Sequence, residues 1–214
     1  MSIQKLAVIG AGTMGNGIAQ VCALAGIDVT LIDISDEALA KGLSALTTNL
    51  DRQLRKETIT AAEMQGALNR ISLSTDYVAL NGAELVIEAA TENLELKKRI
   101  LKRIDDTVSD DCVIATNTSS LSITELAAVV KHPARFIGLH FFNPVPMMAL
   151  LEVIRGLQTS DITHALALKL AEQIGKSAVT ARNSPGFVVN RILCPMINEA
   201  IFVLQEGLAN AKDI

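Results

Sequence analysis

A glycine-rich turn close to the N-terminus constrains the fold of this chain more than any other stretch. Residues 6–9 form a continuous apolar run, the motif GAGTMG follows at residues 10–15, and a helical pattern continues to Gly26. A second apolar run at residues 29–32 then ends in Asp33. Continuous apolar runs are typical of strands buried on both faces of a parallel sheet. The order of strand, glycine turn, helix, strand and acid therefore predicts the first βαβ unit of such a sheet.

Each part of this unit has a physical task in binding a dinucleotide. Gly10 permits the tight turn, Gly12 lets the backbone approach a pyrophosphate, and Gly15 lets helix and strand pack closely. The helix N-terminus presents free N–H groups to the phosphates. Asp33 is placed to accept hydrogen bonds from an adenosine ribose, and its charge repels a 2′-phosphate, which favours NAD over NADP. The alternative is a structural turn followed by a solvent-facing Asp33.

The rest of the chain alternates between strand-like and helical segments. Strands are predicted at residues 70–74, 85–88, 113–116, 136–140, 150–154 and 177–180, and helices at residues 36–69, 93–108, 122–130 and 161–174. Ser35 or Asp36 is expected to cap the first of these helices, which breaks near residues 58–60, and Ser160 to cap the last. The alternation predicts an α/β fold with a doubly wound, mostly parallel Rossmann sheet.

Polar residues stand at the ends of several predicted strands. Ligands of doubly wound sheets bind outside the carboxyl ends of the strands. We therefore expect one rim of the sheet to collect Glu88, Asn117, Ser119 and His140. His140 is followed by a proline-rich turn at residues 143–146, and Glu152 lies in the next apolar run. Taken alone, such a histidine is more often a core residue than a catalyst.

Composition narrows the range of partners. The chain of 214 residues has a net charge of -4 and only 3% aromatic residues, which argues against a nucleic-acid partner. Cys22, Cys112 and Cys194 are widely spaced and lack a nearby histidine, so neither a disulfide framework nor a metal site is expected. No apolar run reaches the ~18 residues of a membrane span, and because the first strand begins within a few residues of the N-terminus we expect no signal segment. We expect a soluble, cytoplasmic protein.

A second domain is predicted to begin near residue 185. The sequence Ser184-Pro185-Gly186 separates residues 1–184 from residues 185–214, where a segment at 187–204 is apolar nearly all round. Such a helix must be buried against something. The last ten residues are too few to cover it, so we expect further C-terminal helices or a partner subunit.

Four motifs together identify a family resemblance. They are the glycine turn, NTSS at residues 117–120, HFFNPVP at residues 140–146, and PGFVVNR at residues 185–191. In this order and spacing the chain resembles the L-3-hydroxyacyl-CoA dehydrogenase family from its first strand to its last residue. The resemblance implies an NAD-binding Rossmann domain followed by an all-helical domain that forms a homodimer. This chain would hold the first domain and only the opening helix of the second, so we expect weak or absent turnover from residues 1–214 alone.

The resemblance also implies an activity, the NAD-dependent oxidation of L-3-hydroxyacyl-CoA to 3-oxoacyl-CoA. His140 would take the proton of the 3-hydroxyl group as general base, and Glu152 would orient the imidazole and stabilise its protonated form. Ser119 and Asn190 would hydrogen-bond the reacting oxygen and neighbouring substrate groups. The alternatives are a dehydrogenase of free 3-hydroxy acids and a non-catalytic NAD-binding protein.

Ligand contacts follow from the same match. Cofactor contacts are expected from Gly10, Gly12, Thr13, Met14, Gly15, Asp33, Glu92, Lys97, Asn117, Ser119 and Asn143. A weaker match places Asn49, Arg52 and Lys56 at the acyl-CoA substrate. Residue 149 departs from the family pattern, because alanine stands where a lysine is common. Alternatively, Glu92 and Lys97 are helix-surface charges, Asn117 and Ser119 are an N-cap pair, and Asn190 is a polar residue at a helix contact.

Overall fold

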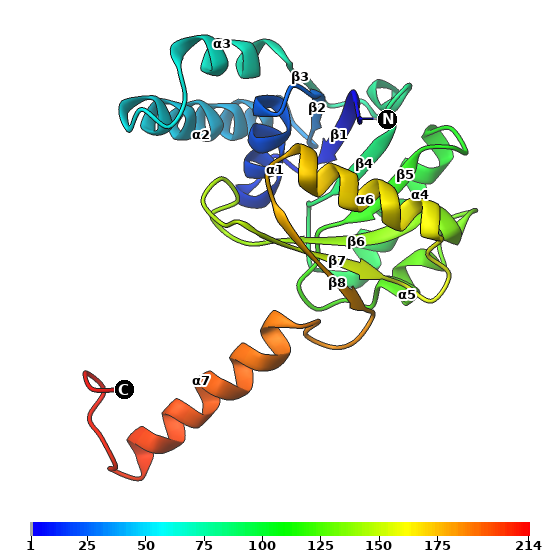
Figure 1. The fold of residues 1–214 in the computed structure, drawn as a ribbon. Helices are drawn as coiled ribbons and strands as arrows, with labels where there is room; N and C mark the ends of the chain where they lie inside the picture. The colour runs from blue at the N-terminus through cyan, green and yellow to red at the C-terminus, as the bar shows by residue number, and fades with distance from the viewer. Residues whose placement is uncertain (1) are drawn as a thin grey trace.

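The computed structural model describes residues 2–214 and contains an eight-stranded sheet in the order β3-β2-β1-β4-β5-β6-β7-β8 (Figure 1). All neighbouring strands are parallel except β6 and β7, which are antiparallel. The strand order reverses between β1 and β4, which is where a doubly wound sheet binds its ligand. The predicted mostly parallel Rossmann sheet is therefore confirmed. The strands are β1 (Lys5–Ile9), β2 (Asp28–Ile32), β3 (Ile71–Ser74), β4 (Leu85–Glu88), β5 (Val113–Thr116), β6 (Phe136–Phe141), β7 (Leu150–Arg155) and β8 (Ser177–Arg182).

The helices cover both faces of the sheet, because alternate side chains of each strand point to opposite faces. In β1, Leu6 and Val8 pack in the core that includes Ile18, whereas Ala7 and Ile9 pack in the core on the other side. The helices are α1 (Thr13–Leu24), α2 (Asp36–Arg55), α3 (Ala61–Asn69), α4 (Leu94–Thr107), α5 (Ile123–Ala127), α6 (Asp161–Gln173) and α7 (Val189–Gln205), with short 3-10 turns η1 (Tyr77–Leu80) and η2 (Pro133–Arg135).

The predicted helix boundaries hold with one clear exception. Ser35 caps α2, Ser160 caps α6, and the long first helix breaks between α2 and α3, as expected. The helix predicted at residues 122–130 ends as α5 at Ala127. Beyond this end, the amides of Val129 and Val130 donate hydrogen bonds to the carbonyl oxygens three residues earlier. The chain therefore tightens into a 3-10-like turn.

Helix α7 extends away from the sheet, and none of its residues is buried (Figure 1). Its apolar side chains are exposed, including Ile192 at 65% and Met196 at 60%. The apolar surface predicted for this helix is therefore present in the structure. Within residues 2–214, every helix is too short or too polar to cross a membrane.

Candidate active site

The glycine turn packs directly against the loop that follows β4. Gly10 has a φ of +101°, and a Cβ atom there would lie 2.7 Å from the Cα of Ala90. A Cβ at Gly15 would lie 1.7 Å from the carbonyl oxygen of Gly10. By contrast, no atom lies within 4 Å of the Cβ position of Gly12. Positions 10 and 15 thus need glycine for packing, while the space in front of Gly12 is open at the N-terminus of α1.

A cavity of about 550 Å³ lies beside this turn. Its wall includes Gly10, Asp33, Tyr77 and Arg103. The guanidinium of Arg103 lies 4.0 Å from the centre of the Tyr77 ring, and burial raises the pKa of Tyr77. Flat side chains beside a carboxylate provide surfaces for a base and a ribose, so the cavity fits the adenosine half of a dinucleotide.

Asp33 is held at the wall of this cavity by two backbone amides. Its Oδ2 accepts a hydrogen bond from the Ala11 amide at 2.6 Å, and its Oδ1 accepts one from the Ile34 amide at 2.7 Å. The carboxylate therefore also ties the end of β2 to the glycine turn. The side chain of Asp33 is thus partly buried and bonded to the turn, and its contact with a cofactor stays a prediction.

His140 and Glu152 form a pair across two antiparallel strands. They are register partners on β6 and β7, and the imidazole Nδ1 lies 2.7 Å from Oε2 of Glu152. Glu152 is completely buried and His140 is 4% exposed. A carboxylate oxygen accepts hydrogen bonds, so a neutral imidazole facing it carries its hydrogen on Nδ1 and leaves Nε2 as an acceptor. The hydroxyl of Ser119, 3.1 Å from Nε2, is the donor to it.

The other oxygen of Glu152 binds the start of α7. Its Oε1 accepts hydrogen bonds from the amides of Val188 and Val189, both at 2.9 Å. A carboxylate at a helix N-terminus satisfies amides that lack a helical partner. Phe187, which precedes them with a φ of 48°, is buried, and its ring centre lies 5.6 Å from that of His140. Sequence reasoning did not predict this link, because it depends on where the chain returns after β8.

A second cavity, of about 260 Å³, opens at the histidine. Sequence-predicted residues make up most of its wall, namely Met14, Glu92, Asn117, Ser119, His140, Asn143 and Asn190. The side chain of Asn117 accepts a hydrogen bond from the Phe141 amide. Nδ2 of Asn190 donates one to the carbonyl oxygen of Ser119, at 3.5 Å. Asn117 and Ser119 are not an N-cap pair, because Ser122 caps α5.

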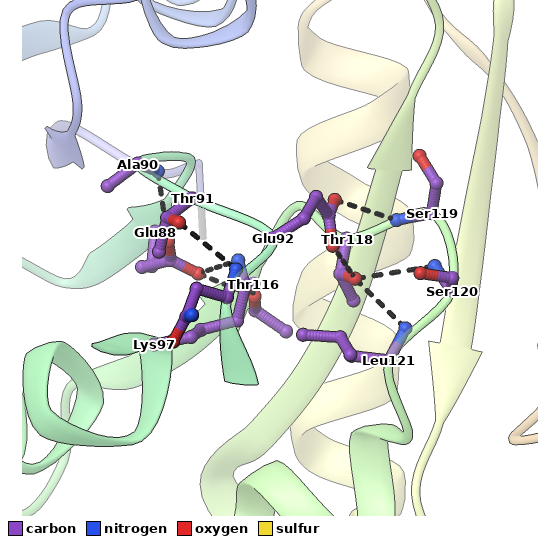
Figure 2. A network of polar contacts seen from close by, with 11 residues as sticks. Glu88, Ala90, Thr91, Glu92, Lys97, Thr116, Thr118, Ser119, Ser120 and Leu121 are labelled. Carbon is purple, nitrogen blue, oxygen red and sulfur yellow. Dashed lines mark hydrogen bonds and ion pairs between the residues drawn. The ribbon is translucent and has the colours of Figure 1, made fainter. Parts of the chain in front are cut away.

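Lys97 lies in the interior of the protein rather than on the surface of α4. Its side chain is completely buried, and the ammonium group contacts the carboxylate of Glu88 and the hydroxyl of Thr116 (Figure 2). Lys97 is therefore not a helix-surface charge, and its ammonium is directed toward Glu88. A contact between Lys97 and the cofactor stays a prediction. Glu88 is the last residue of β4, at the expected edge of the sheet, and its side chain is likewise completely buried.

Glu92 reaches across to the loop that follows β5. Its Oε2 accepts a hydrogen bond from the Thr118 hydroxyl at 2.7 Å, and its Oε1 accepts one from the Ser119 amide at 3.2 Å (Figure 2). Glu92 therefore lies at the histidine cavity and contacts the segment that carries Ser119.

The three residues expected at the CoA portion of the substrate lie elsewhere. Asn49 and Arg52 are on α2, Lys56 follows its last turn, and none of them lines either cavity. The structure thus leaves them apart from His140, and their contact with substrate stays a prediction.

Lys176 is a residue that sequence reasoning missed. Its ammonium donates hydrogen bonds to the carbonyls of Val145 and Met148, at 2.6 and 2.7 Å. It thereby holds the turn between His140 and β7, next to the departure at Ala149, and burial lowers its pKa. No motif signals this contact, because Lys176 is far along the chain. Among residues 2–214 there is also no group of three His, Cys, Asp or Glu side chains suited to a metal ion.

Comparison with known proteins gives consistent matches over the whole chain. The family model described as 3-hydroxyacyl-CoA dehydrogenase, NAD binding domain, matches residues 5–184, and that of the C-terminal domain matches residues 186–214. A 3-hydroxybutyryl-CoA dehydrogenase of Bradyrhizobium diazoefficiens is 45% identical over 99% of this chain and 72% of its own length. A probable 3-hydroxybutyryl-CoA dehydrogenase of Bacillus subtilis is 47% identical over 100% of this chain and 75% of its own.

A solved structure agrees with these matches. The (S)-3-hydroxybutyryl-CoA dehydrogenase from Ralstonia eutropha superposes with a TM-score of 0.97 and is 58% identical, covering 100% of this chain and 75% of that one.

Proposed function

Because the chain belongs to the 3-hydroxyacyl-CoA dehydrogenase family, we propose that it oxidises an L-3-hydroxyacyl-CoA thioester to the 3-oxoacyl-CoA with NAD as the hydride acceptor. The family model places an NAD-binding domain at residues 5–184. The observation that carries the proposal is the position of His140, held between Glu152 and Ser119 at the wall of a cavity. The names of the relatives point to 3-hydroxybutyryl-CoA as the first substrate to test.

His140 is the general base of the proposed reaction. Its Nε2 is an acceptor and already meets the Ser119 hydroxyl, so a substrate hydroxyl beside Ser119 would present its proton to that nitrogen. Transfer of this proton makes the ring cationic, and the buried carboxylate of Glu152 stabilises the cation. As the hydroxyl loses its proton, the C–H bond of the carbon that carries this oxygen also breaks, and a carbonyl group forms. NAD, which Asp33 and the glycine turn would hold, would supply the acceptor for the hydride that leaves this carbon.

The other residues of the site position these groups. Ser119 and Asn190 would hold the reacting oxygen and its neighbours, since both line the histidine cavity. Met14 and Asn143 lie in the same wall, whereas Gly10 and Asp33 lie in the larger cavity beside the glycine turn. One ligand that spans both cavities would therefore present its two ends to different parts of the rim.

The domain division and the assembly belong to the same proposal. Residues 1–184 would form the NAD-binding domain and residues 185–214 the start of a helical domain, which the change of family model between residues 184 and 186 supports. The exposed apolar side chains of α7 favour coverage by further helices and a second copy in a homodimer. The free thiols of all three cysteines favour a reducing, cytoplasmic location.

The test is NADH formation with matched substrates. In a chain that includes the whole C-terminal helical domain, we expect (S)-3-hydroxybutyryl-CoA and NAD to give NADH. Replacement of the thioester by free 3-hydroxybutyrate, or of NAD by NADP, should give little reduced cofactor. His140→Gln is the control, and it should abolish turnover while NAD still binds. NADH from the free acid alone would overturn the thioester specificity. Binding of NAD without turnover of either substrate would instead support a non-catalytic protein.

A further inference from the structure

We propose that Lys176 is a positioning residue, whose ammonium fixes the turn at residues 143–148 and so holds the side chain of Asn143 at the wall of the histidine cavity. The contacts that support this lie within the chain itself. The inference rests on the proposed function only for the role that Asn143 would have toward a bound cofactor.

The turn at residues 143–148 has few hydrogen-bond donors of its own. Its two prolines lack an amide hydrogen, and the amides of its two methionines both bond the carbonyl of Pro144, at 3.0 and 3.1 Å. The carbonyls of Val145 and Met148 are bonded instead by the Lys176 ammonium, at 2.6 and 2.7 Å. One ammonium thus binds two carbonyls that are three residues apart, which fixes the shape of the turn as well as its position.

Helix α1 also packs against this turn. A Cβ atom at Gly17 would lie 2.9 Å from the Cβ of Val145, so the helix backbone approaches the valine closely. Val145 is 2% exposed and belongs to the core on that side of the sheet. Met14 lies three residues before Gly17 on the same face of α1, and it lines the histidine cavity. The turn is therefore held by α1 through the valine side chain and by Lys176 through two carbonyls.

The backbone of Lys176 is fixed on both sides. Gly175, with a φ of +68°, follows the end of α6, and its amide bonds the carbonyl of Glu172 at 3.1 Å. The amide of Lys176 bonds the carbonyl of Ala171 at 2.8 Å, and these two bonds form a Schellman motif. The amide of Ser177 then bonds the carbonyl of the residue before β7, at 2.8 Å, where β8 begins to pair with β7. The ammonium therefore extends from a rigid base toward the turn.

The consequence concerns Asn143, which begins the turn and lines the histidine cavity. His140 does not depend on this turn, because Glu152 and Ser119 hold its imidazole. Loss of the ammonium leaves two carbonyls without their donor, so the turn should shift and carry Asn143 with it. Under the proposed function this change should lower the rate, because small displacements at a reacting site have large effects, and it should leave the cavity beside the glycine turn intact.

The first experiment observes Asn143 without cofactor, through the ¹H and ¹⁵N shifts of its side-chain amide, assigned with Asn143→Ser. We expect Lys176→Met to move these shifts, and Lys176→Arg, which keeps a cationic donor, to restore them. Lys169→Met, at an exposed position on α6, is the control and should leave them in place. Gly17→Ala, which must displace Val145, shows how far the shifts move when the turn moves.

Turnover and ligand affinity complete the test, in the chain that includes the whole C-terminal helical domain. We expect Lys176→Met to lower kcat by about tenfold and Lys176→Arg to recover most of this loss. The Kd for ADP-ribose, which lacks the nicotinamide, should stay unchanged in both variants. Lys176→Gln serves if the methionine variant does not fold, because its shorter side chain cannot reach both carbonyls.

The outcomes separate positioning from a general structural role. Unchanged Asn143 shifts in Lys176→Met, or moved shifts with an unchanged kcat, would overturn the inference. A weaker affinity for ADP-ribose in Lys176→Met would also overturn it, because the damage would then extend beyond the turn. Absence of all turnover in the unsubstituted protein would refute the proposed function, but the Asn143 shifts and the ADP-ribose affinity would still decide whether Lys176 positions the turn.

Discussion

Glu152 and His140 are hydrogen-bonded side chain to side chain at 2.7 Å, and the same carboxylate accepts hydrogen bonds from the amides of Val188 and Val189 at the start of α7. The group that orients the proposed base is therefore also the group that anchors the chain as it leaves the sheet. Any displacement of α7 at this point acts on the carboxylate that holds the imidazole.

Replacing Glu152 by Gln should impair both stability and turnover. An amide cannot accept hydrogen bonds from Val188 and Val189 on one side and from His140 on the other. Loss of hydrogen bonds to a buried charged group costs about 1.5–3 kcal/mol, so we expect a loss of unfolding free energy in this range and a large fall in kcat. Urea unfolding and NADH formation measure the two effects. Glu172→Gln, at an exposed position on α6, is the control, and equal behaviour of the two variants would refute the link.

Replacing Asp33 by Ala should weaken NAD binding. The variant loses both the carboxylate at the cavity wall and its bond to the Ala11 amide in the glycine turn. We expect the Kd for NAD to rise by about tenfold, the effect of about 1.4 kcal/mol. Tyr77 lines the cavity and is the only tyrosine of a chain without tryptophan, so its fluorescence reports binding. Asp28→Ala, at the opposite end of β2, should leave the Kd unchanged, and the same result for Asp33 would remove it from the site.

Replacing Lys97 by Met should destabilise the fold more than it weakens NAD binding. The variant leaves the fully buried Glu88 carboxylate without its cation, which costs about 3–5 kcal/mol when one partner of a buried ion pair is removed. A Lys97→Met, Glu88→Gln double variant should recover part of this loss. Urea unfolding measures the stabilities. A Lys97→Met protein of normal stability but poor NAD affinity would show instead that the lysine serves the cofactor.

The three cysteines should differ in alkylation. Burial raises the pKa of both Cys22 and Cys112 to about 12, so their reactive thiolates stay scarce at neutral pH and increase only as pH approaches that value. Cys194 is exposed on α7. Mass spectrometry after brief iodoacetamide treatment should find modification at Cys194 alone, and at all three residues in urea. Protection of Cys194 in the native protein would show that this part of α7 is covered, and rapid modification of Cys22 would contradict its burial.

Much of the fold follows from local patterns. The strands at residues 85–88 and 113–116 match their predicted bounds, and the βαβ unit around Gly10 is present, because each depends on neighbours within a few residues. The rim of the sheet was predictable for a related reason. Parallel strands bring their carboxyl ends to one edge, so Asn117, Ser119 and His140 meet there whatever the details of the loops.

The sequence by itself determined the elements, their order and the set of polar residues at the rim. Tertiary structure alone decided which way the charged side chains turn. Glu92 faces Thr118 and Ser119, Lys97 faces Glu88, and Lys176 faces the turn after His140. The physical reason is that backbone periodicity depends on adjacent residues, whereas a charged side chain takes the direction in which distant parts of the chain supply its hydrogen-bond partners.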